Sequence, residues 1–209
     1  MNEFDARDLI VEMARSMFER RLTFGSSGNI SVKIDDGWLM TPTGSSLGRL
    51  DPSRLSKLDE KGKLISGDAP TKESFLHLAM YRERATAGAV VHLHSTHSVA
   101  VSCLDGINHD DVLPPITAYY VMRVGKLPLI PYYAPGDAAL GEAVGQFAAK
   151  HAAVLLANHG PIVSGSSLSA AVDAIEELEE TARLYLLLHG KPTHYLSAAQ
   201  MADLMRRFP

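Results

Sequence analysis

The order of strand-like and helix-like segments is the feature that most limits how this chain can fold. Strands and helices are interleaved without a strict strand–helix repeat, as the spacing of apolar residues indicates. A mixed or antiparallel sheet covered by helices satisfies this order. We expect helices at residues 4–22, 71–84, 95–104, 137–150, 167–189 and 197–208. We expect strands at residues 29–34, 38–40, 89–93, 127–130, 153–157 and 160–165, and a short strand pair within residues 55–65.

The length and composition indicate one globular domain, residues 1–209. A chain of this length can bury a substantial apolar core without disulfides. The single cysteine, Cys103, excludes an intrachain disulfide and is typical of a reducing compartment; we interpret it as a packing residue. The net charge of −4 argues against a general nucleic-acid-binding protein, although a local site could still bind a small anion.

The N-terminus and the apolar segments predict a cytoplasmic protein. Residues 1–10 are acidic and amphipathic, and they lack the basic start and the apolar run of a signal peptide. No apolar segment approaches the roughly 18 residues needed to span a membrane. We therefore expect an enzyme or a binding protein of the cytoplasm, with neither a membrane nor a nucleic acid as its partner.

A pair of histidines follows the apolar run at residues 89–91. If this segment is a strand, His92 and His94 point to the same face because side chains alternate. Two imidazoles on one face can bind one metal ion, although a histidine at a strand end is more often a surface or hydrogen-bonded residue. His97 lengthens the run and leaves open which rings bind.

Two further side chains complete a predicted ligand set. His159 follows another apolar strand, and Glu73 lies at the start of a predicted helix. Three histidines and a carboxylate match the ligands that zinc takes in proteins. Glu73 is the candidate for a displaceable ligand, because a freed carboxylate beside the metal can move a proton. The remaining histidines have no such setting, and we expect them to be structural or exposed: His77, His109, His151, His189 and His194.

Small residues form three candidate loops for an anion. Residues 25–29 precede a strand, so they form neither a Walker loop nor a dinucleotide fingerprint, but their backbone N–H groups could still surround one anion. Residues 41–44 form a second loop, and Thr71 and Lys72 lie at a helix start, where the dipole favours anions. Taken alone, each loop is more often an ordinary turn. Lys72 places a cation directly beside the predicted ligand Glu73.

Taken together, these motifs resemble the class II aldolase and adducin family from about residue 5 to about residue 190. The motifs that carry the resemblance are Gly28-Asn29-Ile30-Ser31, Thr41-Pro42-Thr43-Gly44, Glu73, His92-Leu93-His94-Ser95 and Asn158-His159-Gly160. The resemblance implies a single three-layer α/β/α domain with a central, largely antiparallel sheet. It also implies a homotetramer with its active sites near subunit interfaces.

The resemblance further implies the identity of the site residues. Zinc would be held by His92, His94 and His159, with Glu73 as a ligand and as the acid and base; Mn²⁺ or Co²⁺ is the alternative ion. The partner would be a small phosphorylated sugar acid or sugar. Its phosphate pocket would consist of Gly28, Asn29, Thr43, Gly44, Thr71 and Lys72.

Two positions depart from the aldolases of this family. Where the aldolases carry a His-Tyr pair after a proline-rich segment, this chain has Tyr119 and Tyr120, displaced by one or two positions, and Lys72 stands where the aldolases have serine. The sequence therefore more closely resembles the branch that decarboxylates 3-oxo-tetronate 4-phosphates. On this reading Tyr119 or Tyr120 orients the substrate carboxylate, unless both residues serve only interface packing.

The expected reaction follows from that branch. Loss of CO₂ from a 3-oxo-tetronate 4-phosphate, in four-carbon sugar acid catabolism, would pass through a metal-stabilised enediolate. Protonation by Glu73 would then give dihydroxyacetone phosphate. The alternatives are a class II aldolase or an epimerase acting on fuculose phosphate or ribulose phosphate, and a non-catalytic assembly domain like that of adducin.

Overall fold

A computed structural model describes residues 2–134 and 136–208 of the chain. Its helices are α1 (Glu3–Glu19), α2 (Ser74–Glu83), α3 (Thr96–Ser102), α4 (Ala118–Arg123), α5 (Ala138–Ala148), α6 (Leu168–Leu188) and α7 (Ala198–Arg207). Its strands are β1 (Asn29–Ile34), β2 (Gly37–Met40), β3 (Ser56–Leu58), β4 (Leu64–Ser66), β5 (Ala89–His92), β6 (Leu129–Ile130), β7 (Ala153–Leu156) and β8 (Gly160–Gly165). Short 3₁₀ helices at Leu47–Arg49 and Pro52–Arg54 follow β2.

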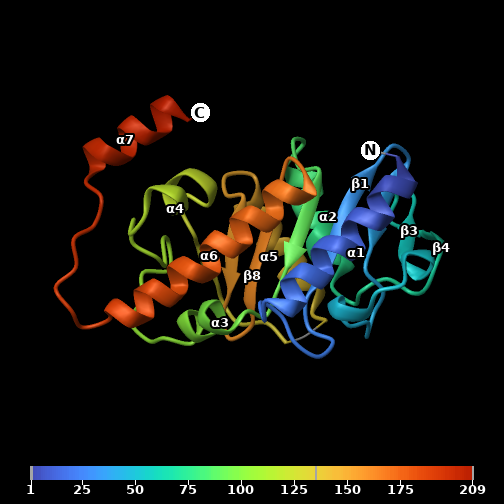
Figure 1. The fold of residues 1–209 in the computed structure, drawn as a ribbon, viewed down its shortest axis with the longest axis horizontal. Coiled ribbons are helices and arrows are strands. Elements are labelled where there is room, and N and C mark those ends of the chain that lie inside the picture. The colour runs from blue at the N-terminus through green and yellow to red at the C-terminus, as the bar shows by residue number, and fades with distance from the viewer. Residues whose placement is uncertain (1, 135, 209) are drawn as a thin grey trace.

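Within these residues, eight strands form one sheet in the order β4-β3-β2-β1-β5-β8-β7-β6. Neighbouring strands are antiparallel, except that β6 and β7 run parallel. Helices α1 and α6 lie across one face of the sheet, whereas α2 and α5 pack together on the other (Figure 1). The expected α/β/α layering around a largely antiparallel sheet is therefore confirmed.

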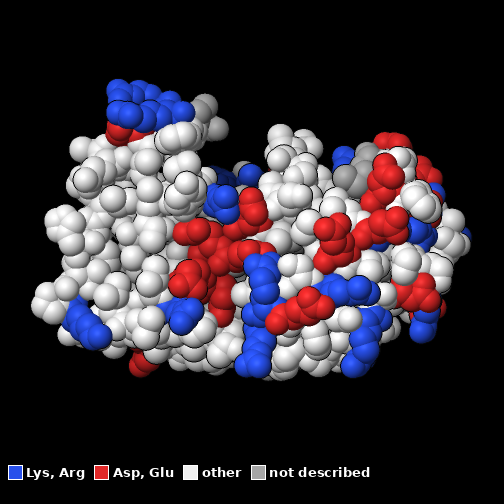
Figure 2. Space-filling view, viewed as in Figure 1, with Lys and Arg blue, Asp and Glu red and all other residues white. Residues whose placement is uncertain are grey.

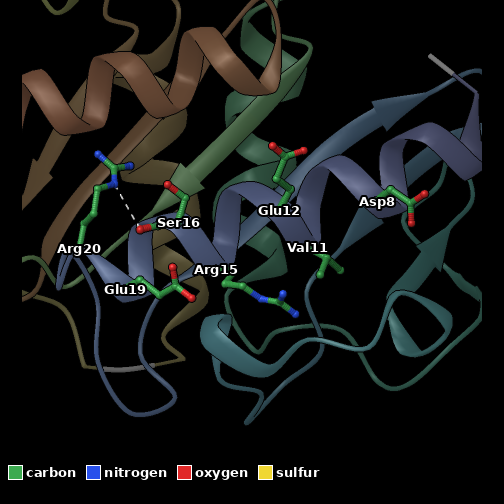
Figure 3. Close-up of a pocket in the computed structure, with 7 residues that line it drawn as sticks. All are labelled: Asp8, Val11, Glu12, Arg15, Ser16, Glu19 and Arg20. Carbon is green, nitrogen blue, oxygen red and sulfur yellow. Dashed lines mark hydrogen bonds between the residues drawn. The ribbon is translucent and has the colours of Figure 1, made fainter.

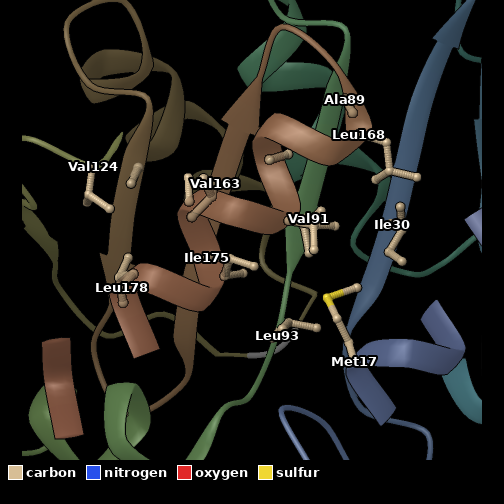
Figure 4. Close-up of a cluster of buried hydrophobic side chains, with 14 of the residues drawn as sticks. Met17, Ile30, Ala89, Val91, Leu93, Val124, Val163, Leu168, Ile175 and Leu178 are labelled. Atoms are coloured by element: carbon tan, nitrogen blue, oxygen red, sulfur yellow. The ribbon is translucent and has the colours of Figure 1, made fainter. Parts of the chain in front are cut away.

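Two apolar clusters hold the layers together. The larger one lies beneath α1 and α6 and joins Met17 and Ile175 to the inward face of β1 and β5, as Figure 4 shows. The smaller one lies between the sheet and the pair α2 and α5, and it includes Leu76, Val144 and Val90. Successive residues of β5 enter opposite clusters because side chains alternate along a strand.

The structure adds detail that the sequence patterns do not contain. Helix α4 was not predicted, because its six residues are too few to show a helical period. The helix expected from residue 71 begins at Ser74, with Glu73 as its N-cap, and only Leu129 and Ile130 of the strand expected at 127–130 are paired. The prediction that Cys103 packs in the interior is wrong, because this thiol-bearing residue is exposed at the end of α3.

Helix α7 differs from the others because none of its residues is buried. It follows an extended segment and contacts α4 at one end of the molecule (Figure 1). A membrane crossing needs a long apolar helix, and none of the helices in the described part of the chain meets that requirement.

Candidate metal centre

His92 ends the central strand β5 and points toward the side of the sheet that α2 covers. Val91 packs in the cluster beneath α1 and α6 and Val90 in the cluster beneath α2 and α5, so strand alternation turns His92 to the same side as Val90. The ring is fully buried, and Nδ1–H donates to the carbonyl oxygen of Pro161 at 2.8 Å. Burial lowers the pKa of His92 to about 3, so its Nε2 carries a free lone pair at neutral pH.

His159 lies in the tight turn that joins β7 to β8. Asn158 has a φ of 56° and Gly160 a φ of 151°, both in the left-handed half of φ/ψ space. A Cβ atom on Gly160 would lie 2.3 Å from the carbonyl oxygen of Leu93. Glycine therefore allows this turn to approach the segment after β5 so closely that His159 and His94 face each other.

The three imidazoles converge through their Nε2 atoms. These atoms are 3.1 Å apart in His92 and His94, 3.3 Å apart in His92 and His159, and 3.1 Å apart in His94 and His159. Three nitrogens this close, one of them with an established lone pair, repel one another unless a proton or a cation lies among them. Ligands of a tetrahedral zinc ion, at about 2.0–2.1 Å from the metal, lie about 3.3–3.4 Å from one another. The observed separations therefore fit a shared cation.

Glu73 adds a carboxylate to the three nitrogens. Its Oε1 lies 3.1 Å from Nε2 of His159 and its Oε2 lies 3.5 Å from Nε2 of His92. Asn29 donates a side-chain N–H to Oε2 at 2.7 Å. Burial alone would raise the pKa of the Glu73 carboxyl, but His159, His92 and Asn29 outweigh this effect and hold the pKa below its ordinary value. The carboxylate is therefore ionised at neutral pH.

One ligand atom from each of these four residues lies within 4.8 Å of the others. We call Glu73, His92, His94 and His159 the Glu–His₃ cluster. Three imidazoles and one carboxylate form a donor set that can hold a divalent metal ion. The structure thus brings together the four side chains that the sequence motifs single out, from the N-cap of α2, the end of β5 with the segment after it, and the turn after β7.

A cavity of about 310 Å³ adjoins one side of the cluster, with Glu73 and His94 in its wall. The small-residue loops meet in this cavity, although they lie far apart in the sequence. Gly28 and Gly44 have φ values of 80° and 68°, which glycine adopts without strain. Lys72 is exposed and has no ion-pair partner among the described residues. All six residues predicted for the phosphate line this one cavity: Gly28, Asn29, Thr43, Gly44, Thr71 and Lys72.

A second cavity, of about 540 Å³, adjoins Glu73, His94 and His159 on another side. Sequence analysis did not predict its remaining wall, which is partly aromatic: Phe24, Thr96, Val99, Tyr132, Tyr133 and Asn158. Tyr132 and Phe24 are 64% and 60% exposed, which is unusual for large apolar side chains. A sequence signal for Tyr132 and Tyr133 was the run Pro-Tyr-Tyr-Ala-Pro-Gly at residues 131–136. It places two aromatic residues in a segment too rich in proline for a helix, and therefore in a loop.

The structure places Tyr119 and Tyr120 outside both cavities. Tyr120 is 1% exposed within the larger apolar cluster; burial raises the pKa of its hydroxyl, which has no hydrogen-bond partner among the described residues. Tyr119 is 59% exposed, and the guanidinium of Arg123 lies 5.5 Å from its ring centre. Within one chain, neither tyrosine reaches the Glu–His₃ cluster, so a role at the site remains a prediction that requires a second copy.

The other histidines divide into three groups. His97 lies next to the cluster in sequence, but its Nδ1 is bound to Glu179 at 2.8 Å, so this ring is engaged elsewhere. His77 is fully buried and hydrogen-bonded to Asn29 and Ser31 behind the cluster. The rest are exposed or half-buried at the surface: His109, His151, His189 and His194.

A third hollow, which is larger than these two cavities at about 650 Å³, lies elsewhere. It follows the outer side of α1, where Asp8, Glu12, Arg15 and Glu19 project from the helix (Figure 3). Acidic and basic groups are also interspersed over the rest of the face formed by α1 and α6 (Figure 2). Because this hollow contains none of the predicted ligands and no histidine, we assign the functional site to the Glu–His₃ cluster.

Comparison with known proteins shows which proteins the whole chain resembles. The family profile named Class II Aldolase and Adducin N-terminal domain matches residues 8–186. The chain is 50% identical over 204 residues to the 3-oxo-tetronate 4-phosphate decarboxylase of Pectobacterium atrosepticum, covering 97% of this chain and 94% of that protein. The crystal structure of YgbL from Escherichia coli superposes with a TM-score of 0.95 at 48% identity, covering 97% and 98% of the two chains. The L-fuculose phosphate aldolase of Methanocaldococcus jannaschii is 35% identical over 178 residues, 85% of this chain and 93% of that protein.

Proposed function

Because this chain belongs to the class II aldolase and adducin family, we propose that it is a 3-oxo-tetronate 4-phosphate decarboxylase. The reaction is that of a carbon–carbon lyase, which releases CO₂ and forms dihydroxyacetone phosphate. The decarboxylase relative is 50% identical across nearly the whole chain, whereas the aldolase relative is 35% identical over a shorter part. One observation in the structure carries the proposal. Glu73 and His94 belong to the Glu–His₃ cluster and also line the cavity formed by the small-residue loops, so a ligand in this cavity can reach the cluster.

The small-residue loops would bind the substrate phosphate. Gly28 and Gly44 turn backbone toward the cavity, and Thr43 and Thr71 add hydroxyl groups. Lys72 adds a positive charge at the rim of this cavity. N–H groups, hydroxyls and an ammonium are the donors that a phosphate accepts. Fixing the phosphate in this cavity would place the other end of a four-carbon substrate against the Glu–His₃ cluster.

His92, His94 and His159 would hold a divalent ion, with Glu73 as a further and displaceable ligand. Such an ion supplies a Lewis acid to a ketone oxygen and a neighbouring hydroxyl group. We propose zinc, because three imidazoles and one carboxylate suit it, with Mn²⁺ or Co²⁺ as the alternatives. The orientation of His92 supports the proposal, since its bond to Pro161 fixes the tautomer that presents Nε2.

Glu73 would carry the proton that completes the reaction. When the bond between C1 and C2 breaks, CO₂ leaves and the electron pair shifts toward the oxygen on C3. C2 must then gain one proton, and Glu73, once protonated from solvent, can deliver it from the cavity wall. The carboxylate is ionised at rest, so after each turnover it can again serve as a ligand of the divalent ion.

Further parts of the proposal concern the assembly. We propose that residues 1–209 act as one domain of a homotetramer in the cytoplasm, in the breakdown of four-carbon sugar acids. Phe24 and Tyr132 are exposed in the wall of the second cavity, and Tyr119 is exposed outside both cavities. Exposed aromatic side chains of this size support contact with a second copy. Tyr119 could then orient a substrate carboxylate across that contact, whereas the buried Tyr120 would support α4 from within.

A substrate comparison tests the function. Purified protein loaded with zinc is incubated with a 3-oxo-tetronate 4-phosphate and, separately, with fuculose phosphate, and both CO₂ and aldehyde are measured. We expect CO₂ and dihydroxyacetone phosphate from the first substrate and little aldehyde from the second. Aldehyde release without CO₂ would replace the decarboxylase with an aldolase.

A further inference from the structure

A row of buried polar side chains connects α2 with β1 behind Glu73. Glu73, His77 and Tyr81 occur every four residues, so they share one face of α2 and its N-cap, about 6 Å apart along the axis. Asn29 and Ser31 are two residues apart on β1, about 6.6–6.8 Å along the strand, and face α2. Because the two spacings are nearly equal, the helix residues and the strand residues interdigitate.

The contacts follow this order without a gap. Asn29 donates to Oε2 of Glu73 at 2.7 Å, and its Oδ1 lies 2.5 Å from Nε2 of His77. On the other side of the ring, Nδ1 of His77 lies 2.7 Å from the hydroxyl of Ser31, which lies 2.9 Å from the hydroxyl of Tyr81. His77 and Ser31 are fully buried, and Tyr81 is buried as well. We call Glu73, Asn29, His77, Ser31 and Tyr81 the polar row.

The ionised carboxylate fixes the direction of every bond in the polar row. Glu73 can only accept, so Asn29 must present its N–H to Glu73 and its oxygen to His77. The oxygen of Asn29 requires N–H at Nε2 of His77, and Nδ1 of the neutral ring then accepts a hydrogen bond from the hydroxyl of Ser31. Burial lowers the pKa of His77 to about 4, which keeps the ring neutral at pH 7. Each donor thus has an acceptor, and the reverse order would place an amide oxygen against a carboxylate.

We propose that His77 is a positioning residue for proton transfer by Glu73. By holding the oxygen of Asn29, it keeps the Asn29 N–H on Oε2 and leaves Oε1 on the side of His159 and the two cavities. This inference rests on the proposed function, because Glu73 needs a fixed position only if it moves a proton. A row that served packing alone would contribute to stability but would leave turnover unchanged.

Three variants separate positioning from packing. His77→Leu removes both polar contacts of the ring, His77→Gln can still donate an amide N–H to Asn29, and Tyr81→Phe removes only the far hydroxyl of the row. We expect His77→Leu to lower kcat about tenfold or more, with KM within about twofold of wild type and the metal content unchanged. His77→Gln should recover kcat to within about threefold of wild type. Tyr81→Phe should keep kcat within about twofold while its melting temperature falls by a few degrees.

A second background tests whether His77 acts through Glu73. If it does, adding His77→Leu to Glu73→Gln should lower kcat no further, whereas independent effects would multiply. Full kcat in His77→Leu, a further tenfold loss in the double variant, or losses of kcat that follow melting temperature across all three variants would overturn the inference. If wild type releases no CO₂ from the tetronate phosphate, the proposed function fails instead.

One measurement does not depend on turnover or on folding of a variant. In the metal-free wild-type protein, ¹H–¹⁵N correlation spectra of the imidazoles should show His77 as the neutral Nε2–H tautomer at pH 7. The Nδ1–H tautomer would turn the Asn29 amide over, place its oxygen toward Glu73 and overturn the inference.

Discussion

Two carboxylates that are largely buried, Glu73 and Glu179, lie near the segment that joins β5 to α3, and they differ in what surrounds them. Glu179 of α6 accepts the backbone N–H groups of His97 and Ser98 at 2.9 and 2.8 Å, and the hydroxyl of Ser98 at 2.7 Å. Glu73 accepts one amide, from Asn29, and otherwise faces the imidazole nitrogens of the Glu–His₃ cluster.

The difference separates a structural carboxylate from a functional one. Around Glu179 the partners are two backbone N–H groups, one hydroxyl and the Nδ1 atom of His97, all at the start of α3, so the carboxylate caps that helix and has little remaining capacity. Around Glu73 the nitrogens come from two converging imidazoles and one amide, and the carboxylate also borders two cavities. A partly buried carboxylate beside a cavity, with oxygens that can still accept a hydrogen bond or bind a cation, is a candidate for binding a metal ion or a substrate or for transferring a proton.

The largest effect is expected at a ligand of the cluster. His94→Ala removes one of three converging nitrogens, so we expect loss of most bound metal and a fall in kcat/KM of more than about a thousandfold, or about 4 kcal/mol. Metal content by elemental analysis and CO₂ release are the measurements. The matched control is His97→Ala, whose ring contacts Glu179 rather than the cluster and which should keep its metal. Near-normal turnover in His94→Ala would remove the cluster from the chemistry.

The same substitution in both carboxylates tests the comparison directly. Glu73→Gln keeps the shape of the side chain but cannot carry the proton, so we expect kcat to fall by about a hundredfold to ten-thousandfold while part of the metal is retained. Glu179→Gln should lower kcat by less than about threefold. Equal losses of kcat in the two variants would mean that Glu73 is no more functional than Glu179.

The pH dependence of stability should reveal His77, one of the two fully buried imidazoles near Glu73. The pKa of His77 is about 4 in the folded protein and about 6.5 in an unfolded chain. The folded state therefore binds fewer protons between these values, and stability, complete above about pH 6.5, decreases as the pH falls toward 4. For His77 the loss is on the order of 3 kcal/mol. Glu73, whose pKa is lowered on folding, contributes a further loss only below its ordinary pKa.

Urea unfolding of the metal-free protein at several pH values measures this effect, since bound metal would add its own pH dependence. The His77→Leu variant should show a shallower slope between pH 4 and 6.5 than wild type. An unchanged slope in that variant would assign the pH dependence to other groups.

On the Glu179 side the expected effect concerns stability. Glu179→Gln replaces a charged acceptor of two backbone N–H groups with a weaker acceptor and turns an amide N–H toward donors. Hydrogen bonds to a charged group contribute about 1.5–3 kcal/mol, so we expect a loss of about 2 kcal/mol in the free energy of unfolding. Chemical unfolding measures it, and Ser98→Ala, which removes one of the bonds, should show a smaller loss.

The two regions also differ in how far the sequence could predict them. The shared face of His92 and His94 follows from strand alternation, and Glu73 follows from the start of a helix, because both are local patterns. Bringing His159 to them depended on the family resemblance, since only the folded sheet places the turn after β7 beside β5.

The contacts that sequence reasoning missed depend on which elements pack together. The spacing of Glu73, His77 and Tyr81 is visible in the sequence, but its meaning depends on β1 lying against α2, which no local pattern states. Tyr132 and Tyr133 lie in an irregular segment, which has neither the helical nor the strand spacing of apolar residues on which a prediction could rest. Interior packing and loop course are tertiary properties, so a single sequence leaves them open.

The smallest effect is expected at the rim of the phosphate cavity, where Lys72 stands. An exposed ammonium that meets a phosphate in solvent gains little, so we expect Lys72→Ser to raise KM for the phosphorylated substrate about fivefold with kcat nearly unchanged. Added salt should reduce the difference between variant and wild type, because it screens an exposed pair. Lys61→Ser, at another exposed lysine, is the control and should leave KM unchanged. An unchanged KM in Lys72→Ser would mean that this lysine does not contact the phosphate, and that backbone and hydroxyl groups bind the anion alone.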